Sequence, residues 1–146
     1  MTEIVTHPNT IFADGLTKVF DDTTVVDDLH LKVPSGAIFG FIGPSGCGKT
    51  TSVRLLLGIY TPTSGDAKVL QTNPQKFGRK ERSQIGYMPQ QFVLYPELSV
   101  WENLNFSASL YGVPVRRKER LNELLELVEL TGHEKKKVRD LSGGMQ

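Results

Sequence analysis

Apolar residues in the first part of the chain follow the patterns of β-strands. Residues 11–20 are rich in β-prone side chains, and residues 25–33 continue, after a polar turn, with apolar and polar positions in alternation. This arrangement predicts an antiparallel β ribbon. Two short apolar runs, residues 37–42 and residues 85–88, have the length and continuous apolar character of strands buried in a parallel sheet. A further short strand is expected at residues 66–70, which follow a segment dense in turn formers.

Helical signals dominate the second half of the chain. Residues 49–58 can continue as a helix after the first buried run. Ser99 and Glu102 have the spacing of a capping box, which predicts a helix over about residues 100–110. Pro114 suits the first turn of another helix, whose apolar positions recur at i, i+3, i+4 and i+7, namely Leu121, Leu124, Leu125 and Val128. The last two helices are expected to form a small α-helical layer, so the whole pattern predicts an α/β fold.

The composition of the 146 residues is that of an ordinary folded protein. An apolar fraction of 38% is enough for a packed core, and a net charge of +1 gives no reason to expect a nucleic-acid partner. The basic runs at residues 116–118 and 135–137 are interpreted as solvated faces. A single cysteine excludes an intramolecular disulfide and the three histidines lack metal-ligand spacing, so the reducing cytosol is the expected compartment. No apolar run approaches 20 residues, and any membrane process is therefore expected to be served from the aqueous side.

The stretch GPSGCGKT, residues 43–50, fills every required position of the phosphate-binding loop pattern G-x-x-x-x-G-K-[ST]. Its glycines let backbone N–H groups turn inward, and the positive end of the next helix faces the same point, which favours a polyphosphate ligand. Lys49 is expected to reach the β- and γ-phosphates, Thr50 to ligate Mg²⁺ and Thr51 to donate to the α-phosphate. The full pattern and its flanking strand and helix argue against a mere connecting turn. Cys47 is interpreted as a small loop residue.

Two further side chains are candidates for the same ligand. Phe20 lies at the tip of the ribbon, where an exposed ring can stack on a flat heterocycle such as adenine; the alternative is that it packs under the ribbon. Gln90 follows the apolar run 85–88. Because ligands of open α/β sheets gather at the carboxyl ends of strands, Gln90 is expected to reach Mg²⁺ or the attacking water. Gln91 is adjacent, and Gln90 is preferred.

The chain closes with a second candidate for anion binding. Ser142, Gly143 and Gly144 stand at a prospective helix start, where backbone N–H groups and a hydroxyl can meet an anion. Taken alone, these residues are better explained as a flexible Gly-Gly linker. The phosphate-binding loop upstream is what favours the binding interpretation.

Together, GPSGCGKTT, the glutamine of IGYMPQ, the phrase LYPELSVWENL and the closing LSGGMQ resemble the ATP-binding subunit of an ABC transporter, over nearly the whole chain from Ile11 onward. The resemblance implies an α/β fold of the P-loop NTPase class, with an ABC-type, RecA-like parallel sheet core, an N-terminal antiparallel β ribbon and an α-helical subdomain. It divides the chain into a β ribbon and Walker A core, about 11–90, and a Q-loop and helical subdomain, about 91–146.

The resemblance also assigns roles, with ATP and Mg²⁺ as cofactors. Phe20 is the implied adenine-stacking residue, Gln90 the Q-loop glutamine, and Thr50 with Gln90 the metal-binding pair. Lys49 and Gln90 are the implied catalytic residues. The implied nucleotide-binding residues are those of the Walker A loop and of the signature, which contacts the γ-phosphate across a dimer: Gly43, Pro44, Ser45, Gly46, Cys47, Gly48, Lys49, Thr50, Thr51, Ser142, Gly143 and Gly144.

The partners implied by the resemblance are a second ATP-binding subunit, in a homodimer or pseudo-dimer, and an integral membrane permease, with no nucleic acid. The chain is then expected at the cytoplasmic face of the cell membrane, powering export through that permease. The phrase after the Q-loop and the following SLYGVP resemble exporters of the daunorubicin-resistance type more than sugar or amino-acid importers. The transported substrate is not indicated, because in this family the permease largely determines it.

Two departures from the family pattern matter. Met145 occupies the position that is usually glutamine in the signature, a variant that resembles the exporter branch. The sequence also ends at Gln146, before the Walker B aspartate, the general-base glutamate and the switch histidine that the family places downstream. Residues 1–146 therefore resemble a fragment of the domain, and we expect them alone to be catalytically inactive and aggregated or molten.

Other function classes were weighed against transport. A non-transport ABC ATPase of DNA repair normally carries a long coiled coil between Walker A and the signature, and no heptad run separates Lys49 from Ser142. A translation-factor cassette is normally paired with a second cassette in the same chain, and residues 1–146 do not test this. A non-catalytic, truncated product is the third alternative.

Overall fold

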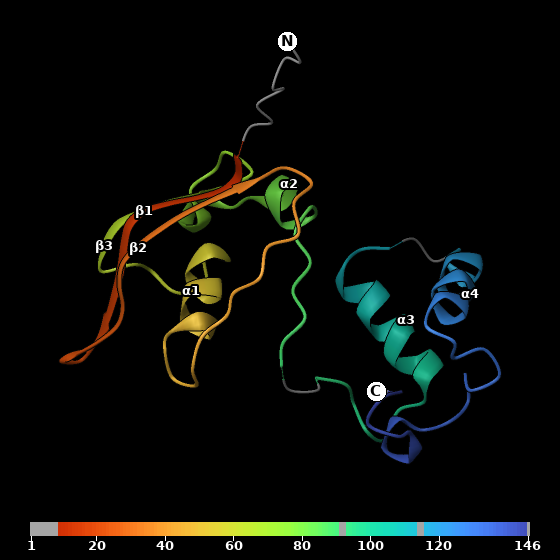
Figure 1. Cartoon of the computed structure of the whole chain (residues 1–146). Helices are drawn as coiled ribbons and strands as arrows, with labels where there is room; N and C mark the ends of the chain where they lie inside the picture. Colours follow the sequence, from red (N-terminus) through yellow and green to blue (C-terminus); the bar gives the residue numbers. More distant parts are fainter. Residues whose placement is uncertain (1–8, 91–92, 114–115, 146) are drawn as a thin grey trace, which may run out of the picture. The chain divides into compact units, whose positions relative to one another are not determined.

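A computed structural model describes residues 9–90, 93–113 and 116–145 (Figure 1). The chain is organised into two compact units, Met1–Gly86 and Tyr87–Gln146. In the described ranges, the strands lie in the first unit, and the second unit contains the two longer helices of the C-terminal half. None of the helices in the described ranges is both long and apolar enough to cross a membrane.

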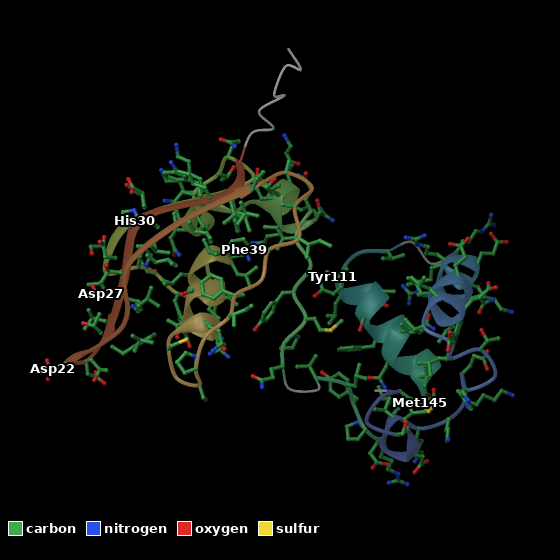
Figure 2. All side chains as sticks on the ribbon, in the orientation of Figure 1. Asp22, Asp27, His30, Phe39, Tyr111 and Met145 are labelled. Carbon is green, nitrogen blue, oxygen red and sulfur yellow. The ribbon has the colours of Figure 1, made fainter. Side chains whose placement is uncertain are left out.

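The first unit is built on a three-stranded antiparallel sheet. Strands β1 (Asn9–Phe20) and β2 (Thr23–Pro34) form the ribbon, and β3 (Ser64–Val69) adds to the other edge of β1, giving the order β2-β1-β3. The register places Ala13 opposite both Leu31 and Ala67. Asp22 marks the tip of the β1–β2 hairpin (Figure 2). The predicted ribbon and the predicted third strand are both confirmed.

Helix α1 (Lys49–Leu56) packs against this sheet and completes the first core. Leu16 of β1 and Leu55 of α1 are fully buried, and each such side chain contributes roughly 1.5–3 kcal/mol through burial. A 3-10 turn, η1 (Pro74–Lys76), and a short helix, α2 (Arg79–Arg82), follow β3. The remaining buried members of the core are Ala13, Val26, Leu31, Val33, Leu56, Ala67, Val69 and Phe77.

The two predicted parallel strands do not form, which corrects the prediction from the sequence. Residues 37–42 and 85–88 carry no strand assignment, and the ladders between described residues are all antiparallel. Phe41 and Ile85 pack against the core, but Ile38 and Ile42 are 104% and 96% exposed. A strand of this kind requires hydrogen-bonding neighbours on its edges. Neither segment finds one in the described part of the chain, so the apolar runs stay unpaired.

The second unit contains helix α3 (Val100–Leu110), helix α4 (Lys118–Leu127) and the 3-10 turn η2 (Val138–Asp140). The predicted capping box is confirmed: the Ser99 hydroxyl accepts from the Glu102 N–H at 3.2 Å, and a Glu102 carboxylate oxygen accepts from the Ser99 N–H at 2.7 Å. This box satisfies two orphan backbone donors and sets the start of α3.

The predicted apolar stripe of α4 is partly confirmed. Leu121 and Leu125 are buried and Leu124 is half-buried, but Val128 lies past the end of the helix and is 57% exposed. The helix begins at Lys118, and Pro114 lies outside the described residues. Leu125 joins Val100 and Leu141 in a second core, which is lined by Trp101, Leu104, Leu130 and Met145.

The sequence analysis interpreted the basic run at residues 116–118 as a solvated face, but the side chain of Arg117 is hydrogen bonded within the protein. Its guanidinium donates to the Asn105 side-chain oxygen at 3.0 Å, to the Asn105 carbonyl at 2.9 Å and to the Ser109 hydroxyl at 2.9 Å. A fourth bond of 3.2 Å reaches the Val113 carbonyl. Because Arg117 immediately precedes α4, these bonds fasten the start of α4 to α3.

Candidate nucleotide-binding site

The phosphate-binding loop leads directly into the N-terminus of α1. Gly48 is the N-cap and adopts the left-handed conformation, with φ of 86°. Among the described residues, no side chain caps this end of the helix, and the first turn contains no acidic residue. The first N–H groups of α1 and the positive end of its dipole are therefore available to an anion.

Gly48 is required at this position for two reasons. Its positive φ disfavours any side chain. A Cβ atom would also collide with the Val25 carbonyl oxygen, so the loop lies directly against β2. At the other end of the loop, a Cβ on Gly43 would come within 2.8 Å of the Cys47 sulfur. These two glycines let the loop close tightly between the sheet and α1.

The side chain of Lys49 lies within the curve of the loop. Its ammonium nitrogen donates to the Gly43 carbonyl at 2.8 Å and to the Pro44 carbonyl at 2.6 Å, and it approaches the Cys47 sulfur at 3.5 Å. The two carbonyl groups carry no net charge. Within the described ranges, the ion pairs do not include Lys49. The loop therefore holds an unneutralised positive charge beside the uncapped helix end, as a polyphosphate ligand requires.

The two threonines predicted to assist Lys49 occupy the first turn of α1. Thr50 is exposed and Thr51 is half-buried. Ser52 is buried, and its hydroxyl donates to the Gly48 carbonyl at 3.1 Å, which anchors the helix to the loop. The described residues contain no cluster of three or more His, Cys, Asp or Glu side chains that would hold a metal. The exposed Thr50 hydroxyl fits a Mg²⁺ ion whose other oxygen ligands come from a nucleotide and water.

Phe20 lies at the end of β1, in the same unit as the loop. Its side chain is 37% exposed, so it is not buried beneath the ribbon. Its ring meets the Tyr60 ring edge-on, with centroids 5.3 Å apart and planes at 77°, and the Lys18 ammonium is 4.8 Å from its centroid. The ring is thus held by two neighbours while keeping surface available for stacking.

The other predicted site residues lie in the second unit. Gln90 is exposed, and the alternative residue, Gln91, lies outside the described residues. Ser142, Gly143 and Gly144 are exposed in a turn in which the Met145 N–H donates to the Ser142 carbonyl at 2.9 Å. Leu141 is buried and Met145 packs against the second core, so both ends of the exposed Ser-Gly-Gly segment are anchored. Met145, the departure from the usual signature, therefore has a packing role.

Sequence reasoning did not single out Asn103, which organises the segment before α3. Its side chain is 5% exposed, accepts from the Tyr95 N–H at 2.8 Å and donates to the carbonyls of Tyr95, Leu98 and Ser99 at 3.0, 3.3 and 3.1 Å. A signal was present in the sequence, because Asn103 shares the apolar face of α3 with Val100. A polar residue at such a position needs hydrogen-bond partners.

Acidic residues of the second unit form its main charged contacts. The pKa of Glu97 is lowered, chiefly by the hydrogen bond of 3.4 Å from the Lys137 ammonium. The guanidinium of Arg139, 2.7 Å from the same carboxylate, lowers this pKa further. The bond from the Ser99 N–H lowers the pKa of Glu102, and the bond from the Gly132 N–H lowers the pKa of Glu134. These groups belong to the second unit, called the helical unit below, and lie outside the phosphate-binding loop.

Comparison with known proteins identifies the family. The family model described as ABC transporter matches residues 26–146 of this chain. The chain belongs to the ABC transporter family. Its fold is that of an ABC ATPase, with an antiparallel β-sheet and helices, and it is similar to a solved "Structure of ATP binding subunit of ABC transporter". The TM-score is 0.78 at 27% identity, covering 93% of this chain and 57% of that one.

Curated relatives include both importers and exporters. The Fe³⁺ ions import ATP-binding protein FbpC of Photorhabdus laumondii is 36% identical over 144 residues, covering 97% of this chain and 40% of the relative. The Nod factor export ATP-binding protein I of Cupriavidus metallidurans is 40% identical over 130 residues, covering 88% of this chain and 43% of the relative. The chain thus spans about two fifths of the length of these relatives.

Proposed function

We propose that this chain binds Mg-ATP at residues 43–51, with Phe20 stacking on the adenine ring. The observation that carries the proposal is the position of Lys49, whose ammonium lies inside the loop on two backbone carbonyls, 2.8 and 2.6 Å away, beside the uncapped N-terminus of α1. A polyphosphate entering the loop gains both the fixed charge of Lys49 and the N–H groups of the helix. Thr50 supplies a hydroxyl for the Mg²⁺ that accompanies the nucleotide.

We further propose that the full-length protein hydrolyses ATP and thereby energises transport through a separate membrane permease. In this proposal two ATP-binding subunits form a dimer, and residues 142–144 of one subunit face the nucleotide held by the other. Gln90 orients the attacking water or contacts Mg²⁺. Support comes from the family assignment and from the exposed, anchored form of the Ser-Gly-Gly segment. The permease would hold the protein at the cytoplasmic face of the membrane.

For the direction of transport we propose export. The phrase LYPELSVWENL and the sequence SLYGVP support this proposal, as does the similarity to the Nod factor export protein. The similarity to the iron import protein favours the opposite direction. The two directions are distinguished by loading inverted membrane vesicles that contain the protein and its permease: an exporter accumulates substrate in them when ATP is added outside, and an importer does not.

The test of the ATP site is the substitution Lys49→Ala in the full-length protein, with Lys80→Ala as the matched control. Lys80 is exposed on α2 in the same unit, away from the loop sequence. Lys49→Ala is expected to lower the ATPase rate by a factor on the order of 10² to 10³, because it removes a preorganised positive charge from the transferring phosphates. Lys80→Ala is expected to leave the rate unchanged. An unchanged rate in Lys49→Ala would overturn the proposed function.

A further inference from the structure

Tyr60 is held in place by two elements of the first unit. Its hydroxyl accepts a hydrogen bond of 3.1 Å from the guanidinium of Arg54, whose central carbon is also 5.7 Å from the centroid of the Tyr60 ring. The Tyr60 N–H donates to the Arg54 carbonyl at 3.3 Å. Arg54 belongs to the last turn of α1, the helix whose first turn follows the phosphate-binding loop. Tyr60 is therefore fixed to the same helix that receives the phosphates.

The second element that holds Tyr60 is the turn η1. The side-chain nitrogen of Gln75 donates to the Tyr60 carbonyl at 2.8 Å. The Gln75 N–H donates in turn to the Asn73 side chain at 2.9 Å, which caps η1. Gly58 makes this arrangement possible, because its φ is 69° and a Cβ atom there would collide with the Pro74 carbonyl oxygen. The segment after α1 is thus wedged between α1 and η1.

Because the Tyr60 ring is fixed in position, its contact with the Phe20 ring also restrains Phe20. The two rings meet edge-on at 5.3 Å, and Lys18, which approaches the Phe20 ring at 4.8 Å, is itself hydrogen bonded to the Thr61 carbonyl at 2.9 Å. Without these contacts an exposed phenylalanine at the end of a strand has several rotamers to choose from. The segment of Tyr60 and Thr61 therefore restrains the ring that is the candidate platform for the base.

We propose that Tyr60 is a positioning residue for nucleotide binding, which sets Phe20 for adenine stacking and ties that platform to the helix of the phosphate site. The proposal rests on the proposed function, because it needs Phe20 to stack on adenine. Fixing the platform before the ligand arrives removes part of the ordering cost of binding. The effect of Tyr60 is therefore expected on the base part of the nucleotide and not on the phosphate part.

The experiment compares two probes, Mg-ATP and Mg-tripolyphosphate, in calorimetric titrations of the full-length protein. Tyr60→Met keeps the bulk of the side chain but removes the ring, and it is expected to weaken Mg-ATP binding roughly 3- to 10-fold while leaving tripolyphosphate binding unchanged. Tyr60→Phe keeps the ring and is expected to bind Mg-ATP within about twofold of the natural protein. Tyr111→Met, a change of the same kind at an exposed residue of the second unit, is the control and is expected to change neither affinity.

A double-mutant cycle with Phe20→Ala tests whether Tyr60 acts through Phe20. In that background Tyr60→Met is expected to cause no further loss of ATP affinity. Additive losses, equal losses for both probes, or an unchanged ATP affinity in Tyr60→Met would each overturn the proposal. If Tyr60→Met does not fold, Arg54→Met replaces it, with an expected loss of about twofold for ATP alone; no loss, or a loss for both probes, overturns the proposal. Failure of both probes to bind the natural protein would instead overturn the proposed function, and this inference with it.

Discussion

The side-chain amide of Asn103 connects the segment at residues 95–99 to helix α3. Both of its polar atoms are used, because the oxygen accepts one backbone bond and the nitrogen is shared among three carbonyls. In the described part of the chain, no buried side-chain nitrogen or oxygen lacks a hydrogen-bond partner. Removing the amide would leave backbone N–H and C=O groups of residues 95–99 without this hydrogen-bond partner while they remain shielded from water.

Asn103→Leu is therefore expected to destabilise the helical unit by about 1–3 kcal/mol. The measurement is urea-induced unfolding, together with hydrogen exchange of the backbone amides from Tyr95 to Leu110. Asn122→Leu is the matched control, because Asn122 is exposed on α4, and it is expected to change stability by less than about 0.5 kcal/mol. Equal effects of the two substitutions would contradict the role given to Asn103.

At the scale of elements, the start of α3 depends on the ionisation of Glu102. Its pKa lies below the ordinary value of 4.5 because the carboxylate accepts hydrogen bonds from the Ser99 N–H and hydroxyl. A carboxyl whose pKa is lower in the folded chain adds stability above its ordinary pKa. That stability is lost as the pH falls through the lowered value.

The melting temperature of the helical unit is thus expected to fall as the pH drops below about 4.5, and to fall less steeply in Glu102→Gln. Glu97 and Glu134 also have lowered pKa values, so part of the pH dependence should persist in the variant. Melting curves followed by circular dichroism between pH 7 and pH 3 provide the measurement. Identical slopes for the variant and the natural protein would show that the capping carboxylate has no such role.

The packing of α4 on α3 depends on Arg117. Its guanidinium makes four hydrogen bonds to α3 and to the segment that follows it. Arg117→Met is expected to cost about 2 kcal/mol, since bonds to a charged group are stronger than neutral ones. Arg120→Met is the control on the same helix. Among the described residues Arg120 makes an exposed pair with Glu123 at 3.2 Å, which is worth at most about 0.5 kcal/mol. Chemical denaturation of both variants measures the two losses in the free energy of unfolding, and equal losses would contradict the role given to Arg117.

The capped helix, the ribbon and the third strand were predictable from the sequence, but the two parallel strands were predicted and did not form. The helix at Val100–Leu110 has the predicted bounds, because a capping box and a local turn define its ends. The runs at 37–42 and 85–88 have the composition of strands, but a strand exists only where a neighbour pairs with it, and composition does not show that. The same limit explains why the network of Tyr60 was missed, since it joins α1, η1 and β1 across long stretches of sequence.

In the candidate site, too, a local sequence pattern was recognisable, whereas roles that depend on distant groups were not determined by it. The loop at residues 43–51 was recognisable from the sequence, because its residue types and spacing match the phosphate-binding pattern, and its binding of a nucleotide is the proposal made above. The hydrogen bonds from Lys49 to the carbonyls of Gly43 and Pro44 were not predicted from the sequence and come from the structure. The roles of Phe20, Gln90 and residues 142–144 stay predictions, because each depends on a nucleotide or on a second subunit.

At the scale of the whole molecule, unpaired apolar segments are the main feature of the first unit. Ile38 and Ile42 are each more than nine-tenths exposed. Each large side chain buried by pairing such segments would add roughly 1.5–3 kcal/mol, against a typical net stability of about 5–15 kcal/mol. The pairing of these segments therefore decides whether the unit is stable.

Residues 1–146 expressed alone are consequently expected to be aggregated or molten and to bind hydrophobic dyes. The same residues within the full-length protein are expected to unfold cooperatively. Amide NMR dispersion and thermal unfolding of the isolated residues make the comparison. A sharp transition with well-dispersed signals would show that the antiparallel sheet and the helical unit are stable without pairing of the exposed segments.

The central claim, that residues 43–51 are a nucleotide site, is tested most directly by a structure of the full-length protein with Mg-ATP or a non-hydrolysable analogue. The account predicts the β- and γ-phosphates within the loop, in contact with Lys49 and the first N–H groups of α1, Mg²⁺ on Thr50 and the adenine ring against Phe20. Nucleotide bound elsewhere, or a loop that stays closed on Lys49 at saturating Mg-ATP with no phosphate in it, would contradict the account.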